Sequence, residues 1–302
     1  MNLEIHPSVA RALAQGRPVV ALESTLICHG LPRPRNLELA LAVEGVVRAE
    51  QAVPATIAVV DGRIRIGLDE STLVRLAQAD DVVKCSPRDL PLVLAQGRLG
   101  ATTVAGTIRL AAMAGIRIMA TGGIGGVHRG GERTLDVSAD LHELARTPVA
   151  VVCSGAKIIL DLPRTLEVLE TLAVPVVSFR CDSFPAFYAR ESGLAVPRVD
   201  ELGQLVELLR AQESLGWPSG MVIANPPPAA LAMAAAELEG WIAAALVMAR
   251  EHGIAGKEET PFLLAEIARR SDGRTVTLNE ALVLDNARLA ARLAAGCHDR
   301  PR

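Results

Sequence analysis

The stretch Val149-Ala150-Val151-Val152-Cys153 is a short run of apolar, mainly β-branched residues, and the small residues Ser154-Gly155-Ala156 separate it from Lys157. A run of this length and composition predicts a buried strand, of the kind found in parallel sheets. Similar runs alternate with helical patterns through the first three quarters of the chain. This alternation predicts an α/β protein: a three-layer α/β/α fold with a mostly parallel central sheet.

The remaining elements follow from the same patterns. We expect strands at 18–22, 55–60, 63–67, 81–85, 116–120, 149–153, 174–179 and 221–224, and helices at 36–51, 71–79, 90–99, 107–114 and 166–172. Asp61-Gly62 predicts a tight hairpin turn. The segment after Pro228 is mainly helical, with helices expected at 229–252, 261–270 and 278–295. No internal repeat or long linker is visible, so we expect one domain spanning 1–302.

Composition excludes several classes of protein. The chain has 302 residues, a formal net charge of −3 and 50% apolar residues, which is typical of a well-packed globular enzyme and not of a nucleic-acid-binding protein. The N-terminus lacks the pattern of a signal peptide. The most apolar long segment, 229–249, is interrupted by Glu237 and Glu239, so we expect a buried helix there and no membrane span.

The five cysteines are widely spaced and form no CxxC pair. Their positions are Cys28, Cys85, Cys153, Cys181 and Cys297. An odd number without metal-ligand spacing predicts reduced thiols and a cytoplasmic protein, since a secreted disulfide scaffold or a zinc site would need paired cysteines.

Lysine is rare, because only Lys84, Lys157 and Lys257 accompany the arginines among 31 basic residues. Arginine carries a positive charge as well as lysine does, but it does not lose its proton near neutral pH and attack a carbonyl. Each lysine is therefore a candidate for chemistry. Lys257 precedes a helix in a polar segment, and we expect a surface or capping role for it.

Two charged residues stand in or directly after predicted strands. Glu23 follows the run 18–22, where a partly desolvated carboxyl group could act as a general acid; an exposed acid at the end of a strand is the equally open alternative. Lys84 lies within the run 81–85. It is either a surface lysine on an edge strand or a ligand for a phosphate or sugar.

A glycine-rich segment, Thr121-Gly122-Gly123-Ile124-Gly125-Gly126-Val127-His128, follows the strand expected at 116–120. Backbone N–H groups in such a loop can surround an anion, although glycine-rich loops are common and the spacing is not a dinucleotide fingerprint. His128 more often would be an ordinary loop residue than a ligand.

Asp136 and Asp140 are separated by Val137, Ser138 and Ala139. Two carboxylates four residues apart could share a helical face and hold a hard cation. The alternative, which this pattern alone favours, is a helix start with Ser138 as N-cap and acids near the positive end of the helix dipole.

Lys157 gives the sharpest chemical signal. It follows a buried strand in apolar surroundings, where desolvation disfavours the ammonium form and leaves a free amine able to form a Schiff base with a sugar aldehyde. A structural lysine paired with a carboxylate is the competing interpretation.

Taken together, these segments resemble the pseudouridine-5′-phosphate glycosidase family, also known as indigoidine-synthesis-A-like proteins, from about Ile5 to Leu293. The resemblance rests on many motifs in one order: 21–25 (ALEST), 29–30 (HG), 88–90 (RDL), 100–107 (GATTVAGT), 121–128 (TGGIGGVH), 136–140 (DVSAD), 153–157 (CSGAK), 184–188 (FPAFY), 224–226 (ANP) and 260–264 (TPFLL).

The resemblance implies an activity and a set of site residues. The family reversibly cleaves the C–C glycosidic bond of pseudouridine 5′-phosphate to uracil and ribose 5-phosphate. Lys157 matches the lysine that captures the ring-opened sugar as an imine, and Glu23 matches the proton donor. Lys84, Val104, Ser138, Ala139 and Asp140 match substrate-binding positions. Thr121 with its glycines is our own candidate for a phosphate cradle, on the physics of the loop.

The resemblance also implies a Mn²⁺ ion bound by Asp136 and a homotrimeric assembly. Hard oxygen ligands suit Mn²⁺ or Mg²⁺ better than zinc. Two segments depart from the family pattern. The residues after His29-Gly30 read Leu31-Pro32-Arg33-Pro34-Arg35, and Pro87 lies close to Lys84. Both departures could alter substrate fit.

Two other functions stay open at this stage. A Schiff-base aldolase or lyase would use Lys157 on a different sugar phosphate and would ignore pseudouridine 5′-phosphate. A non-catalytic sugar-phosphate-binding protein would bind without releasing uracil, but binding alone does not require a nucleophile. The combination of Glu23, Asp136 and Lys157 therefore favours the glycosidase.

Overall fold

A single eleven-stranded sheet runs through the protein. The computed structural model describes residues 3–254 and 259–298. The main path of the sheet has the order β1-β4-β3-β2-β7-β9-β13-β11-β12, and β6 with its neighbour β5 joins it at β3. Its strands are β1 (Leu3–Ile5), β2 (Val19–Leu22), β3 (Val53–Val60), β4 (Arg63–Ile66), β5 (Val83–Cys85), β6 (Gly100–Thr102), β7 (Ile118–Ala120), β9 (Ala150–Cys153), β11 (Val176–Phe179), β12 (Arg198–Val199) and β13 (Met221–Ala224).

The sheet is mostly parallel, as predicted. From β3 through β2, β7, β9, β13 and β11 to β12, every neighbouring pair is parallel. The antiparallel pairs are β3 with β4 and β3 with β6. The hairpin predicted at Asp61-Gly62 is confirmed, because both residues adopt the positive φ angles, 50° and 71°, that a tight turn between strands requires. A separate two-stranded ribbon pairs β8 (Val127–His128) with β10 (Leu160–Asp161).

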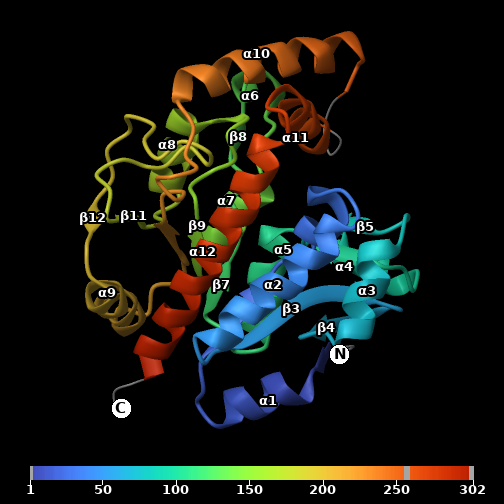
Figure 1. Ribbon diagram of the computed structural model, residues 1–302. Helices are drawn as coiled ribbons and strands as arrows, with labels where there is room; N and C mark the ends of the chain where they lie inside the picture. The colour runs from blue at the N-terminus through green and yellow to red at the C-terminus, as the bar shows by residue number, and fades with distance from the viewer. Residues whose placement is uncertain (1–2, 255–258, 299–302) are drawn as a thin grey trace.

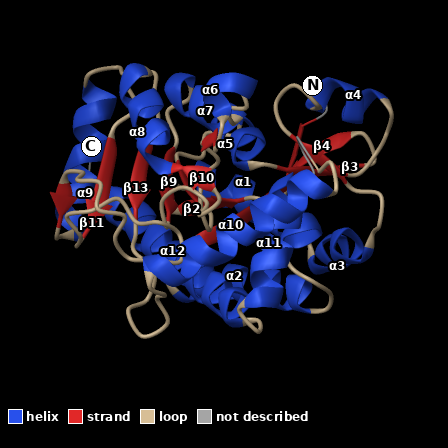
Figure 2. Ribbon diagram, turned by 90° about the horizontal axis from the view of Figure 1, so that it is seen from above, coloured by secondary structure: helices blue, strands red, loops and turns tan. Residues whose placement is uncertain are grey.

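Helices cover both faces of the sheet, which confirms the three-layer arrangement (Figure 2). One face carries α2, α3 and α12, and the other carries α4, α5, α7 and α8. The helices are α1 (Pro7–Ala14), the π-helix η1 (Leu26–Gly30), α2 (Arg35–Ala49), α3 (Glu70–Gln78), α4 (Leu90–Ala95), α5 (Val104–Met113), α6 (Gly131–Thr134), α7 (Ala139–Arg146), α8 (Leu162–Thr171), α9 (Leu202–Ser214), α10 (Ala235–Glu251), α11 (Glu259–Arg270) and α12 (Arg274–His298).

The C-terminal segment is helical, as predicted, but its first helix begins later than the sequence pattern indicates. The prediction began a helix at 229, whereas α10 begins at Ala235. Pro228 instead starts a turn, in which its carbonyl oxygen accepts from the N–H groups of Leu231 and Ala232. The last helix, α12, extends from Arg274 to His298 and crosses the molecule in front of the sheet (Figure 1).

The predictions about membrane spans and about free cysteines can be compared with the described residues. None of their helices combines the length and apolar composition that a membrane span needs.

All five cysteines are free thiols, as predicted. Burial raises the pKa of Cys153 to about 12, so this thiol stays protonated although it immediately precedes the turn that leads to Lys157.

The long helix α12 is attached to the edge of the sheet through one buried side chain, Asn286. Its Nδ2 atom donates to the carbonyl oxygen of Thr121 at 2.9 Å and to the Oγ atom of Ser154 at 3.1 Å. Its Oδ1 atom accepts from Nδ2 of Asn225 at 3.0 Å. Asn286 is 0% exposed, so these bonds are made away from water. One side chain therefore joins the turns that follow β7, β9 and β13.

We predict that Asn286→Leu lowers the free energy of unfolding by about 2 to 4 kcal/mol, because it leaves several buried polar groups without partners. Urea unfolding followed by circular dichroism measures the change. Arg292→Ala is the control on the same helix: it removes an exposed ion pair with Glu50 and should cost under about 1 kcal/mol. Equal losses in the two variants would contradict the structural role of Asn286.

Candidate active site

A cavity of about 580 Å³ opens at the carboxyl edge of the parallel strands. This is where α/β proteins of this kind bind ligands, and the volume lies within the range of sites for small molecules. Every site residue that the sequence predicts lines this cavity: Glu23, Lys84, Val104, Thr121, Asp136, Ser138, Ala139, Asp140 and Lys157. Residues far apart in the chain meet here because the strands are parallel and their ends share one edge.

Glu23 lies directly after β2 and projects into the cavity. The hydroxyl group of Thr121, at the end of β7, donates a short hydrogen bond to its carboxyl group. Burial raises the pKa of Glu23, while the nearby positive charge of Lys157 opposes the rise. The first effect is the larger one, so the carboxyl group holds a proton at higher pH than an exposed glutamate does. This is the property that a proton donor needs.

Lys157 approaches the cavity from the turn after β9. The turn depends on Gly155, which has a φ of +80°; a Cβ atom there would lie 2.0 Å from the carbonyl oxygen of Pro185. The Nζ atom of Lys157 donates to the carbonyl oxygen of Gly123 at 2.8 Å. Within the described residues Lys157 forms no ion pair, which argues against the structural alternative of a lysine paired with a carboxylate.

The glycine-rich loop packs tightly against its neighbours. A Cβ atom on Gly123 would lie 2.7 Å from the ring of Phe187, and one on Gly125 would lie 2.2 Å from Oγ of Ser138. The N–H group of Gly125 donates to Asp140. Close approach therefore explains these two glycines. The role of Thr121 and its loop in binding phosphate stays a prediction.

The segment that contains Asp136 and Asp140 forms the start of α7. Ser138 is the N-cap residue, so Asp136 lies before the helix and the two carboxylates share no helical face. Asp140 accepts from the N–H groups of Ala105 at 2.8 Å and Gly125 at 2.7 Å, and it thereby joins α5, α7 and the glycine-rich loop. Of the two carboxylates, Asp136 is the accessible one, with 40% of its side chain exposed, whereas Asp140 is buried.

Asp136 lies beside two other potential metal ligands. Nδ1 of His128 is 3.9 Å from an oxygen of Asp136 and 3.5 Å from an oxygen of Glu259, the first residue of α11. One ligand atom from each residue lies within 4.8 Å of the other two. In the described part of the chain, this is the one group of three such side chains. One nitrogen and two carboxylate oxygens suit a divalent cation such as Mn²⁺.

The cavity lining combines positive and apolar side chains. The positive side chains are those of Lys84, Arg88 and Arg146, and the N-termini of α5 and α7 also line the cavity. Helix N-termini and cations both attract anions. Apolar side chains come from η1, α11 and the segment that contains Phe187, and α12 contributes Asn279. The sequence offers no chemical reason to select Leu26 and Asn279, because they lie within helical segments.

Of the two segments that depart from the family pattern, one lies away from the cavity and the other lines it. Arg33 donates to the carbonyl oxygens of Ala77 and Ala79 at the end of α3, and Arg35 pairs with Glu280 of α12. Neither arginine lines the cavity. Pro87 does line it, next to Arg88.

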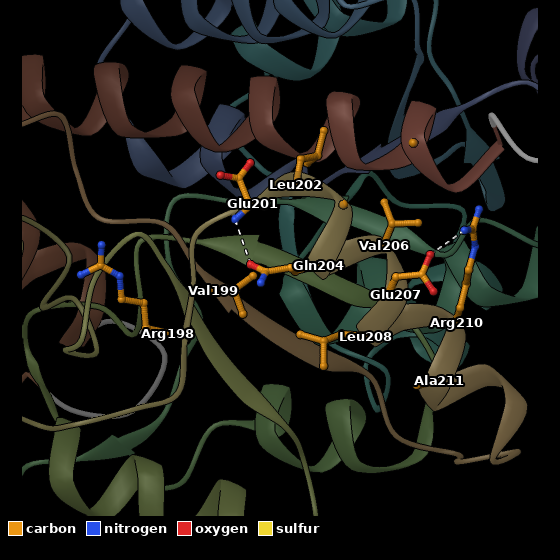
Figure 3. Close-up of a pocket in the computed structure, with 12 residues that line it drawn as sticks. Arg198, Val199, Glu201, Leu202, Gln204, Val206, Glu207, Leu208, Arg210 and Ala211 are labelled. Carbon is orange, nitrogen blue, oxygen red and sulfur yellow. Dashed lines mark hydrogen bonds and ion pairs between the residues drawn. The ribbon is translucent and has the colours of Figure 1, made fainter.

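A second hollow, of about 890 Å³, lies beside α9 near the C-terminal end of α12 (Figure 3). Several of its polar side chains already have partners: Gln204 accepts from the backbone N–H group of Glu201, and Arg210 pairs with Glu207 at 2.9 Å. It contains neither a lysine nor a histidine and lies far along α12 from the sheet edge that holds Glu23 and Lys157. We therefore assign the chemistry to the smaller cavity.

Comparison with known proteins gives a consistent result. The family model "Indigoidine synthase A like protein" matches residues 8–296. Two proteins named pseudouridine-5′-phosphate glycosidase are similar: the one from Methylobacterium nodulans is 57% identical over 97% of this chain and 87% of its own length, and the one from Paracoccus denitrificans is 54% identical over 97% of each chain.

Two solved structures are also similar. The prealnumycin C-glycosynthase AlnA in complex with ribulose 5-phosphate has a TM-score of 0.91 and 41% identity, covering 98% of this chain and 97% of its own. An indigoidine synthase A-like protein from Thermotoga maritima has a TM-score of 0.89 and 34% identity, covering 97% of this chain and 95% of its own.

The raised pKa of Glu23 predicts how stability changes with pH. The folded protein keeps the Glu23 proton at pH values where the unfolded chain, with a glutamate pKa of about 4.3, has lost it. This contribution to stability is fully present below that pH and is lost as the pH rises through the folded pKa. Relative to wild type, Glu23→Gln should therefore gain stability as the pH rises from about 4 to 8.

Urea unfolding at matched pH values measures this difference. Glu70→Gln, on the exposed first turn of α3, is the control for the removal of a surface carboxylate. A difference between Glu23→Gln and wild type that is constant across the pH range would contradict the assignment.

Proposed function

Because this chain belongs to the indigoidine synthase A-like protein family, we propose that it is a pseudouridine-5′-phosphate glycosidase. It reversibly cleaves pseudouridine 5′-phosphate with water to give uracil and ribose 5-phosphate, and it is in this sense both a lyase and a pseudouridylate synthase. The observation that carries the proposal is that one cavity holds the amine of Lys157, which forms no ion pair among the described residues, and the carboxyl group of Glu23, whose pKa is raised by burial.

The type of bond explains why a lysine is needed. An ordinary glycosidase protonates the oxygen of the leaving group with one carboxyl group and uses a second carboxylate on the sugar. The bond between uracil C5 and ribose C1′ has no such oxygen. An amine that has added to C1′ instead offers a nitrogen lone pair, which forms a C1′=N bond as the C1′–C5 bond breaks toward the uracil ring.

The steps follow from the positions of Glu23 and Lys157. The Lys157 amine adds to C1′ as the ring oxygen leaves with a proton from Glu23. The Glu23 carboxylate takes up the proton that the added nitrogen loses and delivers it to uracil C5. The C1′–C5 electron pair then returns to the uracil ring, and the nitrogen lone pair forms the C1′=N bond. Water hydrolyses the imine, which frees ribose 5-phosphate and regenerates the amine.

We assign the phosphate to the positively charged part of the cavity lining. Lys84 supplies a cation there, and Ser138, Ala139 and Asp140 begin α7, whose N-terminus faces the same space. Val104 begins α5 beside them. The bond from Thr121 to Glu23 gives Thr121 a second role, that of holding the proton donor in place.

The cluster of His128, Asp136 and Glu259 supports the proposal of one Mn²⁺ ion per subunit, with Asp136 as the predicted ligand. A bound divalent cation would supply positive charge that polarises and orients oxygen atoms of the sugar phosphate. We also propose a homotrimer, from the family resemblance, and a cytoplasmic location, from the unpaired cysteines. Light scattering of the purified protein tests the trimer.

The activity is tested by mass spectrometry of the products after the protein is mixed with Mn²⁺ and pseudouridine 5′-phosphate. We expect wild type to release uracil and ribose 5-phosphate and Lys157→Ala to release neither. Reduction with borohydride in the presence of ribose 5-phosphate should add the mass of the reduced sugar to the peptide that contains Lys157.

Lys84→Arg is the matched control for this experiment, because it removes the other described lysine of the cavity and should still be labelled at Lys157. Labelling of Lys157 without release of uracil would favour an aldolase acting on another sugar phosphate. Binding without either labelling or turnover would favour a non-catalytic binding protein.

The metal proposal has its own test. Asp136→Asn should weaken Mn²⁺ binding by at least ~10-fold, measured by isothermal titration calorimetry or by the electron paramagnetic resonance signal of free Mn²⁺. His128→Ala and Glu259→Gln should weaken it as well if both residues contact the ion or its water ligands. Glu132→Gln, an exposed carboxylate of α6 outside the cluster, is the control. Unchanged affinity in Asp136→Asn would rule out this site.

A further inference from the structure

Ser24, the residue that follows Glu23, is fully buried and joins three elements of the protein. Its Oγ atom donates to the carbonyl oxygen of Ile57 in β3 at 2.7 Å and accepts from the backbone N–H group of Thr102 in β6 at 2.8 Å. Its own carbonyl oxygen accepts from the N–H groups of Ile27 and Cys28 and so begins η1. One small residue therefore connects β3, β6 and η1 directly beside the proton donor.

Ser24 lies where the sheet divides. β2 pairs with β3 as far as Thr56, and β3 pairs with β6 from Ala58 onward. Ile57 lies between these two pairings, and its carbonyl oxygen accepts from two hydroxyl groups, those of Ser24 and Thr102. The side chain of Ser24 thus maintains a connection to β3 that the backbone of β2 no longer makes.

This arrangement gives Glu23 a fixed neighbour on each side. Leu22, the last residue of β2, pairs with Ala120 of β7, and Ser24 is held by β3 and β6. The backbone of Glu23 therefore has little freedom to move. Its carboxyl group stays buried in the cavity, where it accepts from the hydroxyl group of Thr121.

The bond to β6 also connects Glu23 to the part of the cavity to which we assign the phosphate. Thr102 ends β6 and is followed by Thr103, the N-cap residue of α5. β6 pairs with β5, which contains Lys84. Only a few bonds, made at Ser24, therefore separate the proton donor from the groups that surround the phosphate.

We propose that Ser24 is a positioning residue for the reaction: its hydroxyl group holds the carboxyl group of Glu23 at a set distance from the bound sugar phosphate. This inference rests on the proposed function. A substrate that is fixed by its phosphate group receives a proton only from a donor within hydrogen-bond reach, and a displacement of about 1 Å can lower the rate about 100-fold. Ser24 therefore acts on turnover and not on binding.

Steady-state kinetics of uracil release by Ser24→Ala test the proposal. We expect kcat to fall about 10- to 100-fold and KM for pseudouridine 5′-phosphate to change by less than about threefold, because the groups that bind the phosphate keep their own partners.

The upper pH limit of kcat should also move to lower pH in Ser24→Ala. A carboxyl group that leaves its buried position loses the cause of its raised pKa, so it gives up its proton at lower pH. The charged groups that face Glu23 are Lys157 after β9, Lys84 of β5 and Asp140 of α7, and the substitution changes none of them.

Thr107→Val is the matched control. Thr107 is fully buried, and its hydroxyl group lies 2.8 Å from that of Thr102. The substitution therefore removes a buried hydroxyl group close to Ser24 while both bonds of the Ser24 side chain remain. It should lower the melting temperature but leave kcat and its pH profile unchanged. Ser24→Cys, whose sulfur is a weaker donor and acceptor, gives a second variant and should fall between Ser24→Ala and wild type.

A second measurement needs no activity. In the Ser24→Ala background, the pH-dependent change in stability that Glu23→Gln produces should become smaller, because the Glu23 carboxyl group is no longer held in its buried position. Urea unfolding from about pH 4 to 8 measures it.

The outcomes distinguish this inference from the proposed function. An unchanged kcat or pH limit in Ser24→Ala would overturn the role of Ser24, and so would a fall in kcat that Thr107→Val shares. If wild type released no uracil, the proposed function would fail. The stability measurement would then still decide whether Ser24 holds Glu23 in place, and an undiminished pH dependence in Ser24→Ala would show that it does not.

Discussion

Buried hydrogen bonds from Asn286 connect the turns that follow β7, β9 and β13. The catalytic geometry is built on these turns. The turn after β7 provides the carbonyl oxygen of Gly123, which accepts from the amine of Lys157, and the hydroxyl group of Thr121, which donates to Glu23. Nucleophile and proton donor are thus positioned relative to the same short loop.

Charge is distributed around this loop in a way that suits the proposed chemistry. Burial favours the proton on Glu23, and the neighbouring Lys157 limits how far its pKa rises, so the carboxyl group can give up its proton and take it back. The cavity lining combines positive side chains and the N-termini of α5 and α7 with apolar side chains such as those of Leu26, Phe187 and Leu264. Such a lining suits a ligand that has an anionic phosphate group and a flat base.

The sequence carries information about the fold chiefly in its short apolar runs. The run that becomes β9 predicts a buried parallel strand because it has no polar face, and Glu23 and Lys157 stand out because they interrupt such apolar surroundings. Helix α9 was missed although Glu201 and Gln204 form a capping box, a local signal that could have predicted its start. The start of α10 was placed too early because an alanine-rich segment has high helix propensity, whereas the turn at Pro228 decides the backbone there.

Residues that reach the cavity from helices could not be found in this way. Asn279 and Glu259 lie in ordinary helical patterns, and only the packing of α11 and α12 over the sheet edge brings them to the site. Asp136 and Asp140 look alike in sequence, yet one lies before the helix and the other bonds to backbone N–H groups, because the cap is at Ser138. The sequence alone does not show which of the two carboxylates can contact a ligand, because this depends on the tertiary structure.

The scarcity of lysine has a consequence for a protein that handles aldehydes. Open-chain sugar phosphates condense with any accessible amine, and on most proteins they would slowly modify the many lysines of the surface. Of the three lysines in this chain, Lys84 and Lys157 line the cavity, Lys257 lies outside the described residues, and the other side-chain cations are arginines. A guanidinium group forms no imine under mild conditions. In the described part of the chain, the surface outside the cavity therefore offers an open-chain sugar phosphate no lysine amine to modify.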